Sequence, residues 1–338
     1  MNLAPASTLT ATPTRMRAAV YDNYGAPSEV RVDETNTPAP KPKEVLIKIE
    51  ASSMNALDWH FLTGTPYLMR AMSGLRKPKH RVLGADVVGT VVALGSAADR
   101  FSVGDRVFGE SGHGGFGEYL TIKEKHLAFA PADVPAEQIA ATPVAGLTAL
   151  QGLQSQLHIQ PGERILINGA AGGVGTFAVQ IAKARGAHVT AVCSGRNVDM
   201  VSELGADVVV NYQTDDFVSG HEPFDVMFDN VGNRTAADCL SVLTPNGRYA
   251  ITTGPKTNNF FGPIPKILKT GIRFLFARQS FHQYTAMPNP EDLALLADML
   301  ATGKITPQID RVIGLDGVVD ALTEIGTGHA RAKIVVKP

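Results

Sequence analysis

A glycine-rich run in the middle of the chain constrains the fold more than any other feature. It reads Gly169-Ala170-Ala171-Gly172-Gly173-Val174-Gly175 and follows the short apolar segment 164–168, which has the composition of a buried strand. Beyond it, apolar residues recur at helical spacing and give one face for packing on a sheet. These residues are Val174, Phe177, Ala178, Ile181 and Ala182. Strand, tight turn and helix in this order predict the start of a βαβ unit.

The following segments repeat this alternation. Strand candidates at 188–192, 208–210, 225–228 and 248–252 are separated by helical stretches. This order is typical of a parallel sheet covered by helices, so we expect a doubly wound α/β domain.

The rest of the chain is predicted to be mostly β. Short strands separated by Gly and Pro are expected at 45–49 and 87–92, and the segment 101–107 is expected to turn at Gly104 before another strand. Near the end, helices are expected at 291–301 and 318–325, closed by Gly303 and Gly326, and a last strand at 333–336.

Bulk properties narrow the class of protein. A chain of 338 residues predicts two domains, since domains usually hold about 100 to 200 residues. The net charge of −1 offers no field to gather nucleic acid, and no apolar run approaches the length of a membrane span. Two cysteines are too few for a disulfide framework. Residues 1–14 have no charged or sustained apolar region, so we expect a flexible tail and a cytoplasmic protein.

The glycine-rich run indicates a dinucleotide site. Glycines let the backbone approach a pyrophosphate, and the helix N-terminus offers N–H groups and a positive dipole end. The three fingerprint positions are Ala170, Gly172 and Gly175, so alanine replaces the first glycine, and Gly173 and Val174 complete the turn. The alternative is an ordinary tight connection between strand and helix.

The end of the second strand of this unit favours NADPH over NADH. An NAD enzyme places an acid there, roughly 20 residues after the fingerprint. This chain has Cys193-Ser194-Gly195-Arg196, in which Ser194 can donate a hydrogen bond to a 2′-phosphate and Arg196 can neutralise it. Alternatively, Arg196 only caps the start of a solvated helix.

Several segments resemble one family throughout the chain from Arg17 onward. Besides the glycine-rich run, these are Gly84-Ala85-Asp86-Val87-Val88-Gly89, Val103-Gly104-Asp105-Arg106-Val107 and Pro143-Val144-Ala145-Gly146-Leu147-Thr148-Ala149. They are similar to the zeta-crystallin-like quinone oxidoreductases of the medium-chain dehydrogenase/reductase superfamily. The resemblance implies a GroES-like β-rich catalytic domain from both chain ends (15–144 and 295–338), an inserted Rossmann domain (145–294) that binds NADPH, and a homodimer.

The resemblance also raises the question of zinc. The zinc-dependent alcohol dehydrogenases have a Gly-His-Glu motif that supplies a histidine ligand, and Gly84-Ala85-Asp86 stands in its place. Asn55 matches their first cysteine ligand, and no cysteine precedes Cys193. We therefore expect no metal, because zinc needs three or four soft or imidazole ligands.

Without a Lewis acid, a simple ketone is hard to polarise. A conjugated carbonyl is then the better hydride acceptor, because it takes the hydride at a distant carbon and spreads the resulting negative charge onto oxygen. We expect hydride transfer from NADPH to a quinone or an α,β-unsaturated carbonyl, with Tyr67 and Asn55 as catalytic candidates. Tyr67 lies where the resemblance to enoyl reductases implies a proton-donating tyrosine. Alternatively, it is a packing residue. Asp58 either orients the pocket or caps a turn.

The resemblance, and the rule that ligands bind at the carboxyl ends of parallel strands, implies further cofactor contacts. These are Thr148, Tyr212, Asn230, Val231, Thr252, Thr253, Gly254 and Lys333. Lys333 and its neighbour Arg331 can equally be surface charges.

The aromatic segment 256–284 either walls an apolar substrate pocket or forms a dimer contact or core, and Phe274-Leu275-Phe276 suits an edge strand. The alternative function is that of an NADPH-binding protein with minor catalysis, acting through a dimer or partner surface. The physiological substrate is not predictable from the sequence.

Overall fold

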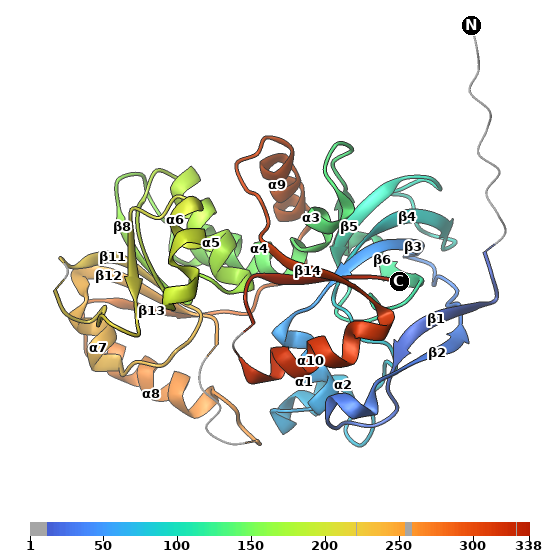
Figure 1. The fold of residues 1–338 in the computed structure, drawn as a ribbon, viewed down its shortest axis with the longest axis horizontal. Coiled ribbons are helices and arrows are strands. Elements are labelled where there is room, and N and C mark those ends of the chain that lie inside the picture. Colours follow the sequence, from blue (N-terminus) through green and yellow to red (C-terminus); the bar gives the residue numbers. More distant parts are fainter. Residues whose placement is uncertain (1–11, 221, 254–258, 329) are drawn as a thin grey trace, which may run out of the picture.

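A computed structural model describes residues 12–220, 222–253, 259–328 and 330–338. It has two halves, each built on a sheet (Figure 1). We call the half at the left of Figure 1 the parallel-sheet half and the half at the right the β-rich half. Helix α4 and strand β14 lie between them in this view.

The parallel-sheet half contains six strands, all paired in parallel, in the order β10-β9-β8-β11-β12-β13. Their bounds are β8 Arg164–Asn168, β9 His188–Cys193, β10 Val208–Asn211, β11 Phe224–Asp229, β12 Leu243–Ile251 and β13 Ser280–Gln283. The strands at 188–192, 208–210, 225–228 and 248–252 are confirmed to within a few residues. The doubly wound expectation is therefore confirmed.

The helices of this half follow their strands in turn. They are α5 Gly173–Ala184, α6 Val198–Glu203, α7 Ala236–Ser241 and α8 Ile264–Phe274. Helix α5 buries the predicted apolar face, including Phe177, Ala178 and Ile181, against the sheet.

The β-rich half is a mostly antiparallel sheet in the order β14-β15-β3-β4-β5-β7, with β6 paired to β3, beside a separate β1–β2 hairpin. The bounds are β1 Arg15–Val20, β2 Arg31–Asn36, β3 Glu44–Ser53, β4 Asp86–Leu94, β5 Arg106–Glu110, β6 Tyr119–Lys123, β7 Leu127–Phe129, β14 Ile309–Gly314 and β15 Lys333–Lys337. Because β15 pairs with β3, both ends of the chain build this sheet, as the GroES-like expectation requires.

The remaining helices are α1 Ala56–Thr63, α2 Arg70–Ser73, α3 Ala136–Ala140, α4 Pro143–Leu150, α9 Pro290–Ala301 and α10 Val318–Thr327. Helix α4 contacts α5 in one half and β5 in the other, and one apolar core spans both halves. The predicted domain boundary at 294/295 falls inside α9, and the division into domains stays a prediction.

Two local predictions are wrong. The segment 274–276 is not an edge strand: Phe274 ends helix α8, and the sheet edge is β13. Helix α10 does not end at Gly326, because a Cβ there would lie 2.4 Å from the ring of Trp59, so this glycine serves packing. The helix ends at Gly328, whose φ of +75° is left-handed.

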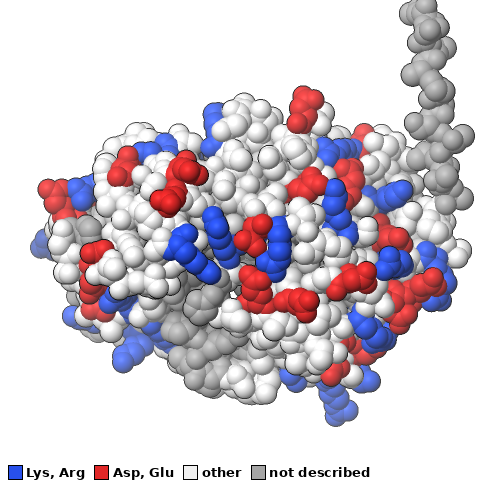
Figure 2. Space-filling model, viewed as in Figure 1, with Lys and Arg blue, Asp and Glu red and all other residues white. Residues whose placement is uncertain are grey.

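The surface carries mixed charge. Figure 2 shows acidic and basic side chains interspersed over the face in view, in keeping with the net charge of −1. Among the described residues, no helix is long and apolar enough to cross a membrane.

Candidate functional site

The glycine-rich turn has the geometry of a phosphate cradle. Gly169, with a φ of +79°, directly follows β8, and Gly172 precedes the first turn of α5 without any side-chain cap. A Cβ on Gly175 would lie 2.1 Å from the Gly169 carbonyl oxygen, so only glycine lets the helix approach the strand. A Cβ on Gly172 would lie 3.6 Å from the Gly169 carbonyl oxygen, an ordinary contact, so the backbone at the helix N-terminus is not closely covered at this position.

Ala170 replaces the first glycine of the fingerprint, and its surroundings show why alanine fits there. It is fully buried, and its N–H donates to the carbonyl of Val192 at 3.0 Å. A methyl group is therefore accommodated beneath the turn, while Gly173 and Val174 begin helix α5. The predicted residues of the run thus lie together in one cradle.

Ser194, Arg196 and Tyr212 follow the carboxyl ends of the neighbouring parallel strands β9 and β10. The Tyr212 N–H donates to the Cys193 carbonyl at 3.1 Å, which ties the two segments together. Arg196 and Tyr212 are exposed, and the Ser194 hydroxyl accepts from the Asn197 amide at 3.0 Å. The three predicted side chains therefore border one exposed surface at the sheet edge.

The end of β11 depends on Asp229, which the sequence analysis did not single out. This fully buried carboxylate accepts from the Asn168 amide at 2.8 Å, from the Val231 and Gly232 N–H groups at 3.0 and 2.9 Å, and from the Tyr249 hydroxyl at 2.9 Å. It shapes the turn that carries the predicted contacts Asn230 and Val231.

Of three further predicted contacts, Thr252 and Thr253 lie beside this turn and Thr148 lies in α4. The Thr252 hydroxyl donates to the Asn230 amide oxygen at 3.1 Å, and Thr253 is exposed. The Thr148 hydroxyl donates to the Val144 carbonyl at 2.7 Å within α4. Gly254 lies outside the described residues.

Lys333 occupies a buried position at the start of β15, so the surface-charge alternative for it is wrong. Only 2% of the residue is exposed. Its ammonium donates to the Asn55 amide oxygen at 2.6 Å, the Met54 carbonyl at 2.9 Å and the Asp86 carboxylate at 3.3 Å. All three of its N–H donors have acceptors within the protein.

We call Ser53, Asn55, Asp86 and Lys333 the polar cluster. The Asp86 carboxylate also accepts from the Ser53 hydroxyl at 2.5 Å, the Asn55 amide at 2.8 Å and the Val144 N–H at 2.8 Å. The cluster therefore joins β3, β4 and β15 to the first turn of α4.

The polar cluster lies directly beneath the glycine-rich cradle. A Cβ on Gly173 would lie 3.0 Å from Cδ of Lys333, and the Ala332 N–H donates to the Ala171 carbonyl at 3.0 Å. The catalytic candidate Asn55 and the cofactor candidate Lys333 are thus in contact with each other, below the expected pyrophosphate position.

Two acids near the cluster hold their protons unusually tightly. Burial raises the pKa of the Asp58 carboxyl to about 7, although the N–H groups of Asn55 and Gly84 donate to it. Burial and the charges of Asp86 and Asp58 raise the pKa of Glu110, which lies opposite Asp86 in the β4–β5 pair, to about 8. Asp58 belongs to the capping box of α1 and also accepts from the Gly84 N–H, which confirms its capping and turn role, while its role in orienting the pocket stays a prediction.

Tyr67 lies apart from the polar cluster. It is 42% exposed, and the Arg70 guanidinium lies 4.6 Å from the centre of its ring. Its N–H donates to the Asn259 carbonyl at 2.8 Å, and its ring meets that of Phe260 edge-on. Tyr67 therefore lies where the β-rich half contacts the segment that leads into α8.

The surroundings of Asn55 and Asp86 bear on the expected absence of zinc. Among the described residues, no group of three or more His, Cys, Asp and Glu side chains converges as metal ligands would. Asn55, which matches the first cysteine ligand of the zinc enzymes, and Asp86 both accept hydrogen bonds from the Lys333 ammonium. The independence from zinc stays a prediction.

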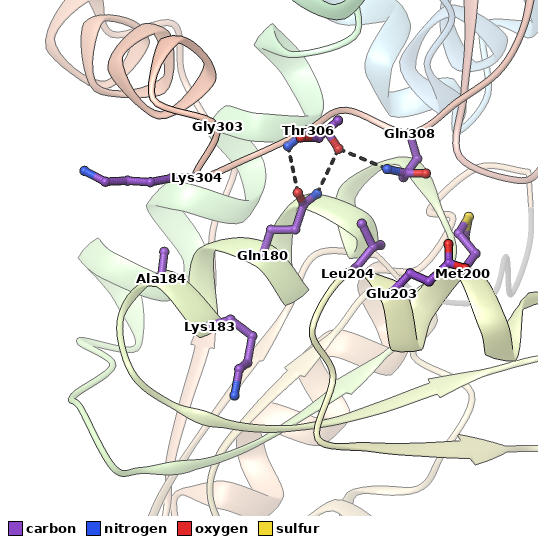
Figure 3. A pocket seen from close by; sticks show the side chains of 10 residues that line it. All are labelled: Gln180, Lys183, Ala184, Met200, Glu203, Leu204, Gly303, Lys304, Thr306 and Gln308. Carbon is purple, nitrogen blue, oxygen red and sulfur yellow. Dashed lines mark hydrogen bonds between the residues drawn. The ribbon is translucent and has the colours of Figure 1, made fainter.

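A separate hollow of about 570 Å³ lies beside α5 and α6 (Figure 3). Its wall includes Gln180, whose amide exchanges two hydrogen bonds with the Thr306 backbone. Gln180 is seven residues beyond the helix start, about 10 Å along the axis at 1.5 Å per residue. The hollow is therefore distinct from the cradle.

Two family models match the chain. Residues 41–132 match the alcohol dehydrogenase GroES-like domain, and residues 204–336 match the zinc-binding dehydrogenase model. The chloroplastic quinone-oxidoreductase QR1 of Triphysaria versicolor is 33% identical over 96% of this chain and 98% of its own length. The chain belongs to the quinone oxidoreductase branch of the medium-chain dehydrogenase/reductase superfamily.

A second relative and a solved structure support the same family assignment. The mitochondrial NAD(P)H oxidoreductase RTN4IP1 of Mus musculus is 32% identical over 98% of this chain and 91% of its own. The solved quinone oxidoreductase of Coxiella burnetii superposes with a TM-score of 0.84, at 28% identity over 96% and 99% of the two chains. This medium-chain reductase is therefore an oxidoreductase that uses a nicotinamide cofactor. Its predicted cytoplasmic location and homodimer stay predictions.

Proposed function

We propose that this protein is a zinc-independent reductase that transfers hydride from NADPH to a quinone or an α,β-unsaturated carbonyl. The observation that carries the proposal is the Lys333 ammonium bound to Asn55 and Asp86 below the cradle. It provides a fixed positive charge at the place where a zinc dehydrogenase would need metal ligands.

The exposed surface at the ends of β9 and β10 supports NADPH. Ser194, Arg196 and Tyr212 border it, and the segment Cys193–Asn197 has no carboxylate that would repel a 2′-phosphate. Arg196 supplies a charge that NADH would leave unused. The cradle of Gly172, Gly173 and α5 would hold the pyrophosphate.

The substrate class follows from the chemistry that the cluster can support. When bound, the reduced nicotinamide supplies hydride to a carbon of the substrate. Conjugation moves the resulting negative charge to an oxygen, and the Lys333 ammonium acts on this charge only through its electrostatic field, since all three of its N–H donors have acceptors within the protein. A simple ketone is a poorer acceptor, because the negative charge that develops on its carbonyl oxygen is not delocalised and no metal polarises the carbonyl group.

We assign separate roles to Asn55 and Tyr67. Asn55 uses both its amide hydrogens and its oxygen within the cluster, so we assign it to positioning Lys333. Tyr67 has a hydroxyl at the contact between the two halves and is the candidate proton donor to the substrate. A further relative is a 2-methylene-furan-3-one reductase of Solanum lycopersicum, which supports conjugated carbonyls as the substrate class.

The test is oxidation of NADPH and NADH by chelator-treated protein with three acceptors: a benzoquinone, an alkyl vinyl ketone and a simple ketone. The proposal expects turnover of the first two with NADPH preferred, and no gain on adding zinc. Binding of NADPH without turnover of either conjugated acceptor would favour the non-catalytic alternative. Activity that returns only with zinc would overturn the proposal.

A further inference from the structure

Arg70, the first residue of helix α2, is held by two aromatic rings and two carbonyl groups. Its guanidinium carbon lies 4.5 Å from the centre of the Tyr24 ring and 4.6 Å from the centre of the Tyr67 ring. Its Nε donates to the Gly64 carbonyl at 2.9 Å, and its Nη2 donates to the Thr63 carbonyl at 3.4 Å. These contacts fix the position of the cation.

The local fold makes room for this guanidinium. Gly64 directly follows α1 with a φ of +58°, and a Cβ there would lie 2.7 Å from both the Arg70 Nε and the Tyr24 ring. The Tyr24 hydroxyl donates to the Gly74 carbonyl at 2.6 Å, just beyond α2. Glycine at position 64 and the tethered tyrosine therefore keep the side chain of Arg70 in one place.

The guanidinium keeps hydrogen-bonding capacity that the protein does not use. Arginine has five N–H donors, and the Gly64 and Thr63 carbonyls take one each. Among the described residues, Nη1 has no acceptor and Arg70 has no ion pair with a carboxylate. The residue is only partly buried, and Nη1 reaches solvent. The unused donors on Nη1 and Nη2 lie side by side, as a carboxylate needs for bidentate binding.

Arg70 lies beside the contact between the two halves. Tyr67, whose ring it contacts, donates its N–H to the Asn259 carbonyl and meets the ring of Phe260. Asn259 follows shortly after Thr253, a predicted cofactor contact at the end of β12. Figure 1 shows α2 at the bottom of the β-rich half, with the segment that leads into α8 extending toward it. The guanidinium is therefore next to the proposed proton donor and faces the same contact.

Acidic residues are missing from both chain segments that meet there. The ranges 59–85 and 239–290 contain no Asp or Glu. Asp22, close in sequence to Tyr24, is already paired with Arg31 and Arg81. A negative charge brought to this contact therefore meets no carboxylate from either segment, and Arg70 offers it a cation.

We propose that Arg70 determines substrate specificity by binding the carboxylate of an α,β-unsaturated oxo acid, whose conjugated part lies beside Tyr67. The inference rests on the proposed function and narrows its substrate class. Hydride from NADPH and one proton reduce the C=C bond of the acid, which gives the saturated oxo acid and NADP⁺, while the carboxylate itself is unchanged. A guanidinium that is already held in place loses little conformational entropy on binding, which favours the pair.

The experiment compares (E)-4-oxopent-2-enoate with its methyl ester, which is the same conjugated ketone without the charge. The values of kcat/KM for both are measured with saturating NADPH in the wild type, Arg70→Met and Arg70→Lys. Arg70→Met should lower kcat/KM for the acid about ten-fold more than for the ester, as expected for loss of a charge-assisted pair. Arg70→Lys keeps the charge without the planar fork and should lose only part of the preference. The acid-to-ester ratio cancels any loss common to both substrates, such as a displacement of Tyr67.

One control variant and one binding measurement complete the design. Arg76→Met removes an exposed cation from the same acid-free segment and should leave the acid-to-ester ratio unchanged. Calorimetric titration of 4-oxopentanoate into the protein with NADP⁺ measures carboxylate binding without turnover, and Arg70→Met should weaken it about ten-fold. Thermal melts check that all three variants are folded.

The outcomes separate this proposal from the proposed function. An acid-to-ester ratio that is the same in the wild type, Arg70→Met and Arg70→Lys would overturn the role of Arg70 while leaving the reductase activity intact. An equal change of the ratio by Arg76→Met would also overturn it. Turnover of neither acceptor would contradict the proposed function. In that case, weakened binding of 4-oxopentanoate by Arg70→Met would still support the carboxylate site, and unchanged binding would overturn it.

Discussion

The surface at the ends of β9 and β10 and the polar cluster below the cradle differ in how they are built. Ser194, Arg196 and Tyr212 lie close in sequence, border solvent and are placed by one parallel strand pair. Lys333 and Asn55 are 278 residues apart, and their contact is buried. The first region presents an exposed charge to solvent, whereas the second fixes a charge where water is excluded.

This difference predicts unequal costs of mutation. An exposed charge interacts through water, so its loss mainly removes one contact with the ligand. A buried ion pair loses far more when one partner is removed, because the other is left buried without compensation. The predictions below test this contrast, from the largest expected effect to the smallest.

Lys333→Met should lower the free energy of unfolding by about 3–5 kcal/mol, because it leaves the Asp86 carboxylate buried and unpaired. Urea unfolding measures this loss. Lys337→Met on the same strand is the matched control, since its ion pair with Glu137 is exposed and worth about 0–1 kcal/mol. Equal losses in both variants would contradict the contrast.

The raised pKa of Glu110 should make stability fall as pH rises. Between its ordinary pKa near 4.5 and its folded value of about 8, the native state keeps a proton that the unfolded state releases. The slope contributed by this group is at most about 1.4 kcal/mol per pH unit. Urea midpoints from pH 5 to 8 should be flatter for Glu110→Gln than for the wild type. An unchanged slope would show that Glu110 is not the group.

Arg196→Ala should weaken NADPH binding by about 1–3 kcal/mol and leave NADH binding nearly unchanged, as expected for loss of a charge-assisted hydrogen bond. Calorimetric titration with both cofactors measures this. Arg185→Ala, which removes an exposed charge at the other end of α5, should affect neither. Equal weakening of both cofactors by Arg196→Ala would refute contact with the 2′-phosphate.

Tyr67→Phe should lower kcat about tenfold, equivalent to about 1.4 kcal/mol, while the affinity for NADPH stays the same. The effect should be modest because the residue is partly exposed and water can replace its hydroxyl as proton donor. Steady-state kinetics with an enone would show it. An unchanged kcat would show that Tyr67 is a packing residue and not the proton donor.

The sequence predicted the parts of the molecule that depend on neighbouring residues. The βαβ unit and the cradle from Gly169 to Gly175 follow from apolar periodicity and from glycine at positions where a Cβ would collide. The burial of Lys333 was not predictable in this way, because its partners come from the opposite end of the chain.

Two other features show where sequence patterns mislead or are overlooked. The aromatic run at 274–276 has strand composition, yet the amphipathic period that begins at Ile264 continues as helix α8 up to Phe274. Asp229 was missed although its signal was available: an acid directly after the apolar strand Phe224–Phe228, at the edge where ligands bind.

The most direct test of the account is the fate of hydride from NADPH deuterated at C4 of the nicotinamide. Chelator-treated protein would be incubated with this cofactor and an α,β-unsaturated ketone, and the product analysed by NMR and mass spectrometry. The account predicts a saturated ketone with deuterium on the β-carbon. An allylic alcohol with deuterium on the carbonyl carbon, or no transfer of deuterium, would contradict it.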